Sequence, residues 1–300
     1  MSDDFDFTRP TPTVSAAPPP AFKAAQSRFY NSGVAAQVFK ASGKEEKFAA
    51  GHPVFGEDEK ASKGGLFKSA SRMYYVVTGD VELVMGAKTV DTVKAGELFG
   101  EMAVITGRPR LASATAKNDT HAWSMDATEF QRAVAKSPEF ALMIASVMYD
   151  RLRFIAAQLA LRPKVAGAQP RMATVFEPQL VAQLEAALPR TATVRYRQEQ
   201  IIMKEGQAGT FMYLVKTGRV AIAVGTTVVE VVGPGGTFGE MAVVDQSPRT
   251  ARAGTLEETE LLQIDRPSLL AVVKKEPAIA MALLRGIADR LRHMNGMLAQ

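Results

Sequence analysis

The sequence FGEMAVITGRPR at residues 99–110 returns as FGEMAVVDQSPR at residues 238–249. The two copies lie 139 positions apart (239 minus 100), and the same offset aligns the DRLR at 150–153 with the DRLR at 289–292 without a gap. A register kept over so long a stretch indicates two copies of one domain. We therefore expect that what one copy binds, the other binds as well.

Short runs rich in β-branched and aromatic residues, broken by glycine, lie on the N-terminal side of each copy. The first repeat contains MYYVVTGDVELVM at 73–85 and KTVDTVKAGELF at 88–99, and the second contains FMYLVKTGRVAIAV at 211–224 and TVVEVVGPGGTF at 227–238. Short strands with glycine turns at this regular spacing predict an antiparallel barrel or double-sheet roll. The expected fold class is mainly β.

Each repeat ends in a helical pattern that begins near a proline. Apolar residues recur at steps of three and four over residues 140–155 and again over 279–298. Pro138 and Pro277 stand where the first turn of a helix tolerates proline. The apolar stripe of the last helix, residues 276–298, also suits a coiled-coil seam, so a homodimer through this helix is one expected arrangement.

Composition shifts along the chain predict its division into domains. Residues 1–25 are rich in Pro and Ala and are expected to form a disordered tail. The first domain is expected over 26–162, a linker over 163–176 and the second domain over 177–300.

Charge and cysteine content narrow the class of protein. The chain has 36 Lys and Arg against 31 Asp and Glu, a mild excess that does not by itself argue for nucleic acid. The absence of cysteine excludes disulfides and thiolate chemistry and fits a reducing compartment. The first 20 residues do not read as a secretory signal, and the longest apolar run, 140–149, falls short of the ~20 residues that span a bilayer. We expect a cytoplasmic protein without a membrane span.

The repeated FGE predicts a strand that turns into a short helix, with glycine at the turn. The glycine lets the backbone approach a ligand closely, and the first-turn amides of the helix have no partner within it. Such a turn is a ready site for an anion. These positions are Gly100 with residues 101–103 in the first repeat and Gly239 with residues 240–242 in the second.

Two charged residues in each copy extend this anion site. Arg110 and Arg249 follow the glutamates by nine residues, behind a proline, and their planar guanidinium groups can pair with a phosphate. Glu101 and Glu240 can only accept hydrogen bonds at neutral pH, so they suit a hydroxyl of the same ligand, such as a ribose 2′-OH. Phosphate and ribose hydroxyl in one pocket indicate a nucleotide.

At these residues the chain resembles the cyclic nucleotide-binding domain family, which includes cAMP receptor proteins and protein kinase A regulatory subunits. The family's phosphate-binding cassette reads FGE, a small apolar stretch and then PR, as both copies do. The resemblance implies two tandem β-roll (jelly-roll) domains with flanking helices. It assigns ribose binding to Glu101 and Glu240 and phosphate binding to Arg110 and Arg249. The amide donors that it implies are Gly100, Met102 and Ala103 in the first site and Gly239, Met241 and Ala242 in the second.

The two copies differ in the residue after the arginine. Thr250 offers a hydroxyl that could meet the 2-amino group of guanine, whereas Leu111 offers only apolar contact. In the family this position influences acceptance of guanine. We expect cyclic AMP at both sites, with cyclic GMP as the alternative and better tolerated at the second site.

Motifs of other function classes do not occur in the sequence. The chain contains no GxSxG, P-loop or paired-carboxylate motif, so an enzyme is not expected and no catalytic residue is assigned. His52, His121 and His293 lack the spacing of metal ligands, so neither a metal nor a cofactor is expected. Eight residues follow the DRLR at 289–292, too few for a helix-turn-helix, so no binding of nucleic acid is expected.

The sequence thus predicts a cyclic nucleotide sensor that acts as a ligand-gated regulatory or adaptor protein on a separate effector protein. The main alternative is an interaction or structural protein that uses the same fold with one or both nucleotide sites non-functional. A DNA-binding regulator and an enzyme are the remaining classes.

Overall fold

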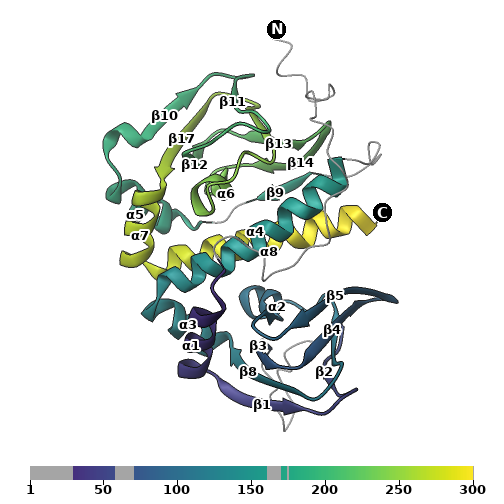
Figure 1. The fold of residues 1–300 in the computed structure, drawn as a ribbon. Helices are drawn as coiled ribbons and strands as arrows, with labels where there is room; N and C mark the ends of the chain where they lie inside the picture. Colours follow the sequence, from purple (N-terminus) through teal and green to yellow (C-terminus); the bar gives the residue numbers. More distant parts are fainter. Residues whose placement is uncertain (1–29, 58–70, 161–169, 174–175, 300) are drawn as a thin grey trace. The chain divides into compact units, whose positions relative to one another are not determined.

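The computed structural model describes residues 30–57, 71–160, 170–173 and 176–299 (Figure 1). The predicted tail and most of the predicted linker lie outside these ranges. The contacts divide the described residues into two compact units, one that ends at Met143 and one that begins at Ile144. Each unit is described by itself.

The first unit is a roll of two four-stranded antiparallel sheets. One sheet has the order β1 (Lys44–Phe48), β8 (Thr120–Asp126), β3 (Arg72–Thr78) and β6 (Leu98–Phe99). The other has the order β2 (Pro53–Phe55), β7 (Ser113–Ala116), β4 (Asp80–Met85) and β5 (Lys88–Lys94). Its helices are α1 (Ser32–Ser42), α2 (Glu101–Thr106), α3 (Ala127–Lys136) and the start of α4 (Pro138–Ala160).

The second unit repeats this topology and adds one strand. Its first sheet has the order β10 (Thr193–Tyr196), β17 (Thr259–Asp265), β12 (Phe211–Thr217) and β15 (Thr237–Phe238). Its second sheet has the order β11 (Ile201–Met203), β16 (Arg252–Thr255), β13 (Val220–Val224), β14 (Thr227–Val232) and β9 (Arg171–Ala173). Strand β9, which comes from the predicted linker, pairs with β14 in parallel.

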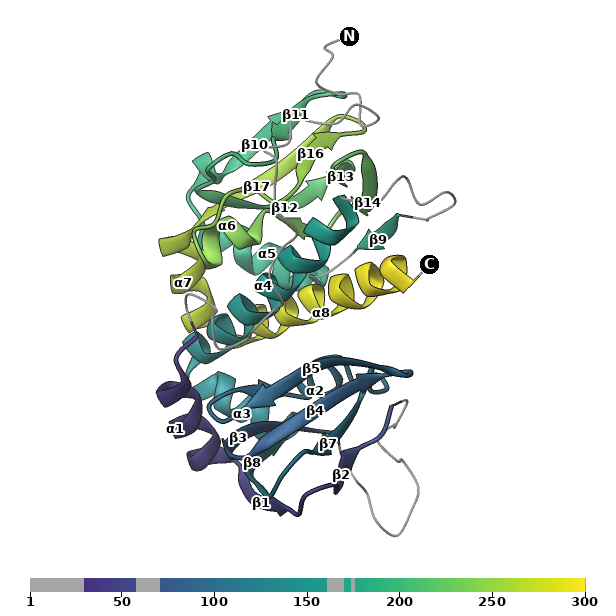
Figure 2. The same ribbon diagram turned by 45° about the vertical axis from the view of Figure 1, so that its right-hand side comes forward.

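The helices of the second unit are α5 (Pro178–Ala187), the short 3₁₀ helix η3 (Arg190–Ala192), α6 (Glu240–Val244), α7 (Arg266–Lys275), α8 (Pro277–Ala299) and most of α4. Helices α4 and α8 lie side by side next to the second roll in both views (Figures 1 and 2). Both begin at the prolines that the sequence singled out. No helix of the described ranges is long and apolar enough to cross a bilayer.

The stripe predicted as a coiled-coil seam on α8 is buried in the single chain. Ile287, Leu291 and Met294 are at most 6% exposed. Leu298, at the end of the stripe, is half-buried, and the homodimer through this helix stays a prediction.

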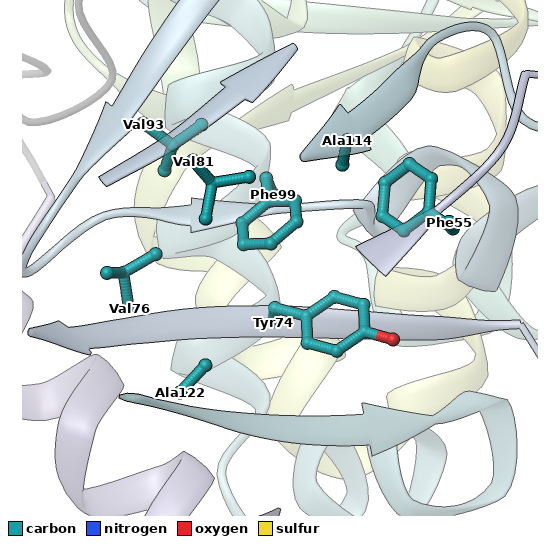
Figure 3. Close-up of a cluster of buried hydrophobic side chains, with 8 residues drawn as sticks. All are labelled: Phe55, Tyr74, Val76, Val81, Val93, Phe99, Ala114 and Ala122. Carbon is teal, nitrogen blue, oxygen red and sulfur yellow. The ribbon is translucent and has the colours of Figure 1, made fainter. Parts of the chain in front are cut away.

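The core of the first roll brings together side chains from facing strands (Figure 3). Tyr74 of β3 stacks on Phe99 of β6 with ring centroids 5.0 Å apart, and in the second unit Tyr213 stacks on Phe238 at the same separation. Such aromatic pairs stabilise a core beyond the area that they bury. Because Phe99 and Phe238 begin the repeated motif, the core fixes the strand that leads into each FGE turn. The predicted mainly β fold with flanking helices is confirmed.

Candidate functional site

Glycine is required at both FGE turns for two reasons. Gly100 and Gly239 are the N-caps of α2 and α6 and have φ of 80° and 76°, in the left-handed region that favours glycine. A Cβ at Gly239 would lie 2.5 Å from Nη1 of Arg249, and one at Gly100 would lie 2.9 Å from Nη1 of Arg110. The glycines therefore permit both the turn and the approach of the arginine.

The backbone holds each predicted phosphate-binding arginine at the start of its short helix. Arg249 donates from Nη1 to the carbonyl of Gly239 at 2.7 Å and from Nη2 to the carbonyl of Phe211 at 2.6 Å. Arg110 makes the two equivalent bonds in the first unit, to the carbonyl of Gly100 at 2.9 Å and to the carbonyl of Arg72 at 2.6 Å. These bonds use two of the five N–H groups of a guanidinium and fix its plane.

Burial makes the charge of Arg249 costly. The residue is 7% exposed, and its burial lowers its pKa, against the opposing influence of Tyr213 and Glu240. Arginine nevertheless stays protonated. An anion beside α6 would therefore stabilise a charge that water reaches poorly.

Glu240 is a buried carboxylate that the protein itself already contacts. It is 3% exposed and accepts hydrogen bonds from Thr237 Oγ1 at 2.5 Å and from Arg290 Nη1 at 2.8 Å. Burial raises the pKa of Glu240, but the charge of Arg290 and these hydrogen bonds outweigh it, and the net pKa is lowered. Glu240 is thus held ionised. Its first-repeat counterpart, Glu101, is also buried.

Arg290 of α8 joins two glutamates inside the second unit. Its Nε donates to Oε2 of Glu230 at 2.8 Å, its Nη1 donates to Glu240, and its Nη2 donates to the carbonyl of Thr237. Burial lowers the pKa of Arg290, yet the two carboxylates outweigh burial and raise it. The sequence analysis used Arg290 only as part of the repeated DRLR. A charged residue within an apolar helical stripe is the signal that could have identified it.

One pocket in the second unit brings the predicted residues of that site together. Six predicted residues line it: Gly239, Glu240, Met241, Ala242, Arg249 and Thr250. The rest of its wall is mostly apolar and comes mainly from β9, β11, β13, β14, β15, α4 and α8. Thr250 Oγ1 donates to the sulfur of Met241 at 3.2 Å, a weak acceptor.

In the first unit the predicted residues surround the start of α2. Residues 101–103 begin the helix, Gly100 caps it, and Arg110 binds the carbonyl of that glycine. Leu111 follows the arginine and is half-buried. The guanidinium of Arg110 also lies over the ring of Phe55, with Cζ 3.9 Å from the centroid. Among the described residues no cluster of His, Cys, Asp or Glu could hold a metal.

Helix α4 contributes to the pocket of the second unit, and the sequence analysis did not predict this contribution. Leu152 and Ala156 lie in the pocket wall. Arg153 lies 2.5 Å from the carboxylate of Asp245, the C-cap of α6, and Asp245 is 2% exposed. This ion pair, in which the carboxylate is buried and the arginine half-buried, joins α4 to the end of the helix whose start carries the predicted anion site.

Replacing Arg153 with alanine should weaken the second site. Because Asp245 would keep a buried charge without its partner, we expect the free energy of unfolding to fall by about 2 to 4 kcal/mol and ligand affinity at the second site to fall by about 3- to 10-fold. Chemical denaturation and ligand titration measure these changes. The matched control is Arg219→Ala, which breaks an exposed pair with Glu257 and should change the free energy of unfolding far less than Arg153→Ala does. Equal effects of the two variants would remove this role from Arg153.

Comparison with known proteins places both units in one family. Residues 45–137 and 193–276 match the cyclic nucleotide-binding domain family. The chain is 31% identical over 128 residues to the CRP-like cAMP-activated global transcriptional regulator of Mycobacterium tuberculosis, a match that covers 41% of this chain and 56% of the regulator. It is 22% identical over 283 residues to the cAMP-dependent protein kinase regulatory subunit of Schizosaccharomyces pombe, covering 91% of this chain and 63% of that protein.

A solved structure of the regulatory domain of Toxoplasma gondii PKA with cAMP is similar at 17% identity and a TM-score of 0.30, over 83% of this chain and 86% of that one. The chain spans less than two thirds of the length of the two curated relatives above. Because the family match covers more than half of the 300 residues, the chain belongs to the cyclic nucleotide-binding domain family, as its motifs predicted, and carries two copies of the domain.

Proposed function

We propose that the protein is a cyclic nucleotide sensor and that cyclic AMP is its ligand at both sites. The observation that carries the proposal is the convergence of Arg249, Glu240 and the turn at Gly239 on one pocket. The phosphate would bind at Arg249 and the start of α6, and the 2′-hydroxyl at Glu240. The apolar wall formed by the sheet, α4 and α8 would cover the base.

The choice of cyclic AMP rests on the relatives and on Leu111. The Mycobacterium tuberculosis and Schizosaccharomyces pombe relatives are named for cAMP, whereas a relative from Eimeria tenella is a cGMP-dependent protein kinase. Cyclic GMP is the second candidate for the second site, since Thr250 lines that pocket and its hydroxyl donates to the sulfur of Met241, a weak acceptor that a ligand could replace.

The proposed output is regulation of a separate effector protein in the cytoplasm, without catalysis by this chain. Helices α4 and α8 both line the pocket of the second unit, so the ligand would contact both helices. A partner protein that binds these helices would respond to a change in their positions. A ligand can shift these helices from one arrangement to another only as far as its affinities for the two arrangements differ. Pull-down with and without cyclic AMP tests for a ligand-dependent partner, and retention on duplex DNA or turnover of the nucleotide would contradict this output.

The ribose contact gives the direct test of the ligand class. We expect 2′-deoxy cyclic AMP to bind at least ~10-fold more weakly than cyclic AMP, because a hydrogen bond to an ionised acceptor is lost. Equilibrium titration of the full chain with both ligands measures the ratio. Equal affinities would remove Glu101 and Glu240 from ribose binding, and binding of neither ligand would overturn the proposed function.

A further inference from the structure

Glu230 presents an unused acceptor to the second pocket. It lies in β14, lines the pocket and is 5% exposed. Its Oε2 accepts from Nε of Arg290 at 2.8 Å, but its buried Oε1 has no hydrogen-bond partner among the described residues. Buried polar atoms are rarely left without such a partner. A donor supplied by a ligand would satisfy this oxygen.

The position of Glu230 favours the base over the rest of a nucleotide. Arg290 bridges Glu230 and Glu240, so a single guanidinium separates Oε2 of Glu230 from the carboxylate assigned to the 2′-hydroxyl. In a nucleotide the base is attached to the ribose carbon next to the one that carries this hydroxyl. The phosphate would bind at Arg249 instead. The group nearest to Glu230 is therefore the base.

Arg171 places a donor next to this acceptor. It lies opposite Glu230 in the parallel pairing of β9 with β14, and it also lines the pocket. Its Nη1 is 3.4 Å from Oε1 of Glu230, an ion-pair contact too long for a strong hydrogen bond. Burial lowers the pKa of Arg171, with Glu230 as the main opposing influence. The pair offers an acceptor and a donor side by side.

Adenine carries the complementary pattern on one edge. Its exocyclic amino group donates, and the adjacent ring nitrogen accepts. The apolar side chains of the same pocket wall, such as Ile222, Val229 and Met294, suit the flat faces of a base.

We propose that Glu230 and Arg171 are specificity-determining residues of the second site, where Glu230 accepts from the amino group of adenine and Arg171 donates to the neighbouring ring nitrogen. The inference rests on the proposed function. The first repeat has Asp91, a shorter carboxylate, at the position of Glu230, and among the described residues of the first unit no strand pairs with β5 as β9 pairs with β14. Recognition of the base by a carboxylate and an arginine is therefore expected at the second site and not at the first.

The test compares two ligands that differ only in the amino group: cyclic AMP and the 3′,5′-cyclic monophosphate of unsubstituted purine riboside. The full chain carries Arg110→Ala so that only the second site is measured. We expect the purine ligand to bind about 10-fold more weakly, because a hydrogen bond to a charged acceptor is lost. The ratio of the two dissociation constants, purine ligand over cyclic AMP, should fall to about 3 in Glu230→Gln, whose amide oxygen is a neutral acceptor. In Glu230→Met this ratio should fall to about 1.

The ratio of two affinities on the same variant separates base reading from a general loosening of the fold. Glu230→Gln keeps the shape of the side chain if Glu230→Met fails to fold, and Glu257→Gln, an exposed carboxylate in the same unit, should leave the ratio unchanged. Equal binding of the two ligands by the unsubstituted site, or an unchanged ratio in Glu230→Gln, would overturn the inference and leave Glu230 a structural ion-pair residue. Binding of neither ligand would instead overturn the proposed function.

Discussion

Arg249→Ala is expected to lower the affinity of the second site for cyclic AMP by about 30-fold to 1000-fold, equivalent to about 2 to 4 kcal/mol. Arg249 is the buried cation at the start of α6, and two backbone carbonyls fix its plane. A phosphate at this place would gain a charge-assisted and bidentate contact that no neutral side chain replaces. Equilibrium titration in an Arg110→Ala background measures the second site alone.

The same substitution also removes two hydrogen bonds from the fold. We expect the free energy of unfolding to fall by about 1 to 3 kcal/mol, so binding is measured well below the melting temperature. Arg249→Lys is the matched control: it keeps the charge but lacks the planar fork, and its affinity should lie between those of the wild type and the alanine variant. An affinity unchanged in Arg249→Ala would remove this residue from the phosphate site.

Arg290→Met is expected to lower the free energy of unfolding by about 3 to 5 kcal/mol at pH 7, because it leaves Glu230 and Glu240 buried without their shared cation. The equivalent change on the exposed face of the same helix, Arg285→Met, should stay within about 0.5 kcal/mol of the wild type. Chemical denaturation of the three proteins measures the difference.

The pH dependence of Arg290→Met should have the opposite sign to that of the wild type. In the wild type the pKa of Glu240 is lowered, so its contribution to stability is present above the unfolded value of about 4.3 and is lost as the pH falls through the folded value. In the variant burial, the largest influence, would be opposed by the Thr237 hydrogen bond without the charge of Arg290, and the pKa of Glu240 should rise above the unfolded value. The folded variant would then bind a proton that the unfolded chain does not, so its stability should rise as the pH is lowered from about 7 toward 5. Parallel pH profiles would contradict the proposed coupling of these charges.

The sequence identified candidate residues for each site that lie within one continuous segment, and those of the second repeat line one pocket. The glycine, glutamate and arginine of FGEMAV…PR occur within twelve residues, and the repeat at 238–249 removed chance as an explanation. Pro138 and Pro277 likewise marked the first residues of α4 and α8 because their signal is local.

The parts that the sequence did not predict depend on contacts between distant segments. Arg290 meets Glu230 across 60 positions, and Arg153 meets Asp245 across 92. Neither pair belongs to a local motif, and a charged residue in a helix is most often solvated. Strand β9 was not predicted for a related reason. Arg171 and its neighbours form a strand because they pair with the edge of β14, which is distant in the sequence.

The most direct test of the central claim is the stoichiometry of cyclic AMP binding by isothermal titration calorimetry. The wild-type chain should bind two ligands, Arg110→Ala and Arg249→Ala should each bind one, and the double variant should bind none at concentrations that saturate the wild type. Undiminished binding of two ligands by the folded double variant would contradict the claim that both FGEMAV…PR copies form cyclic nucleotide sites.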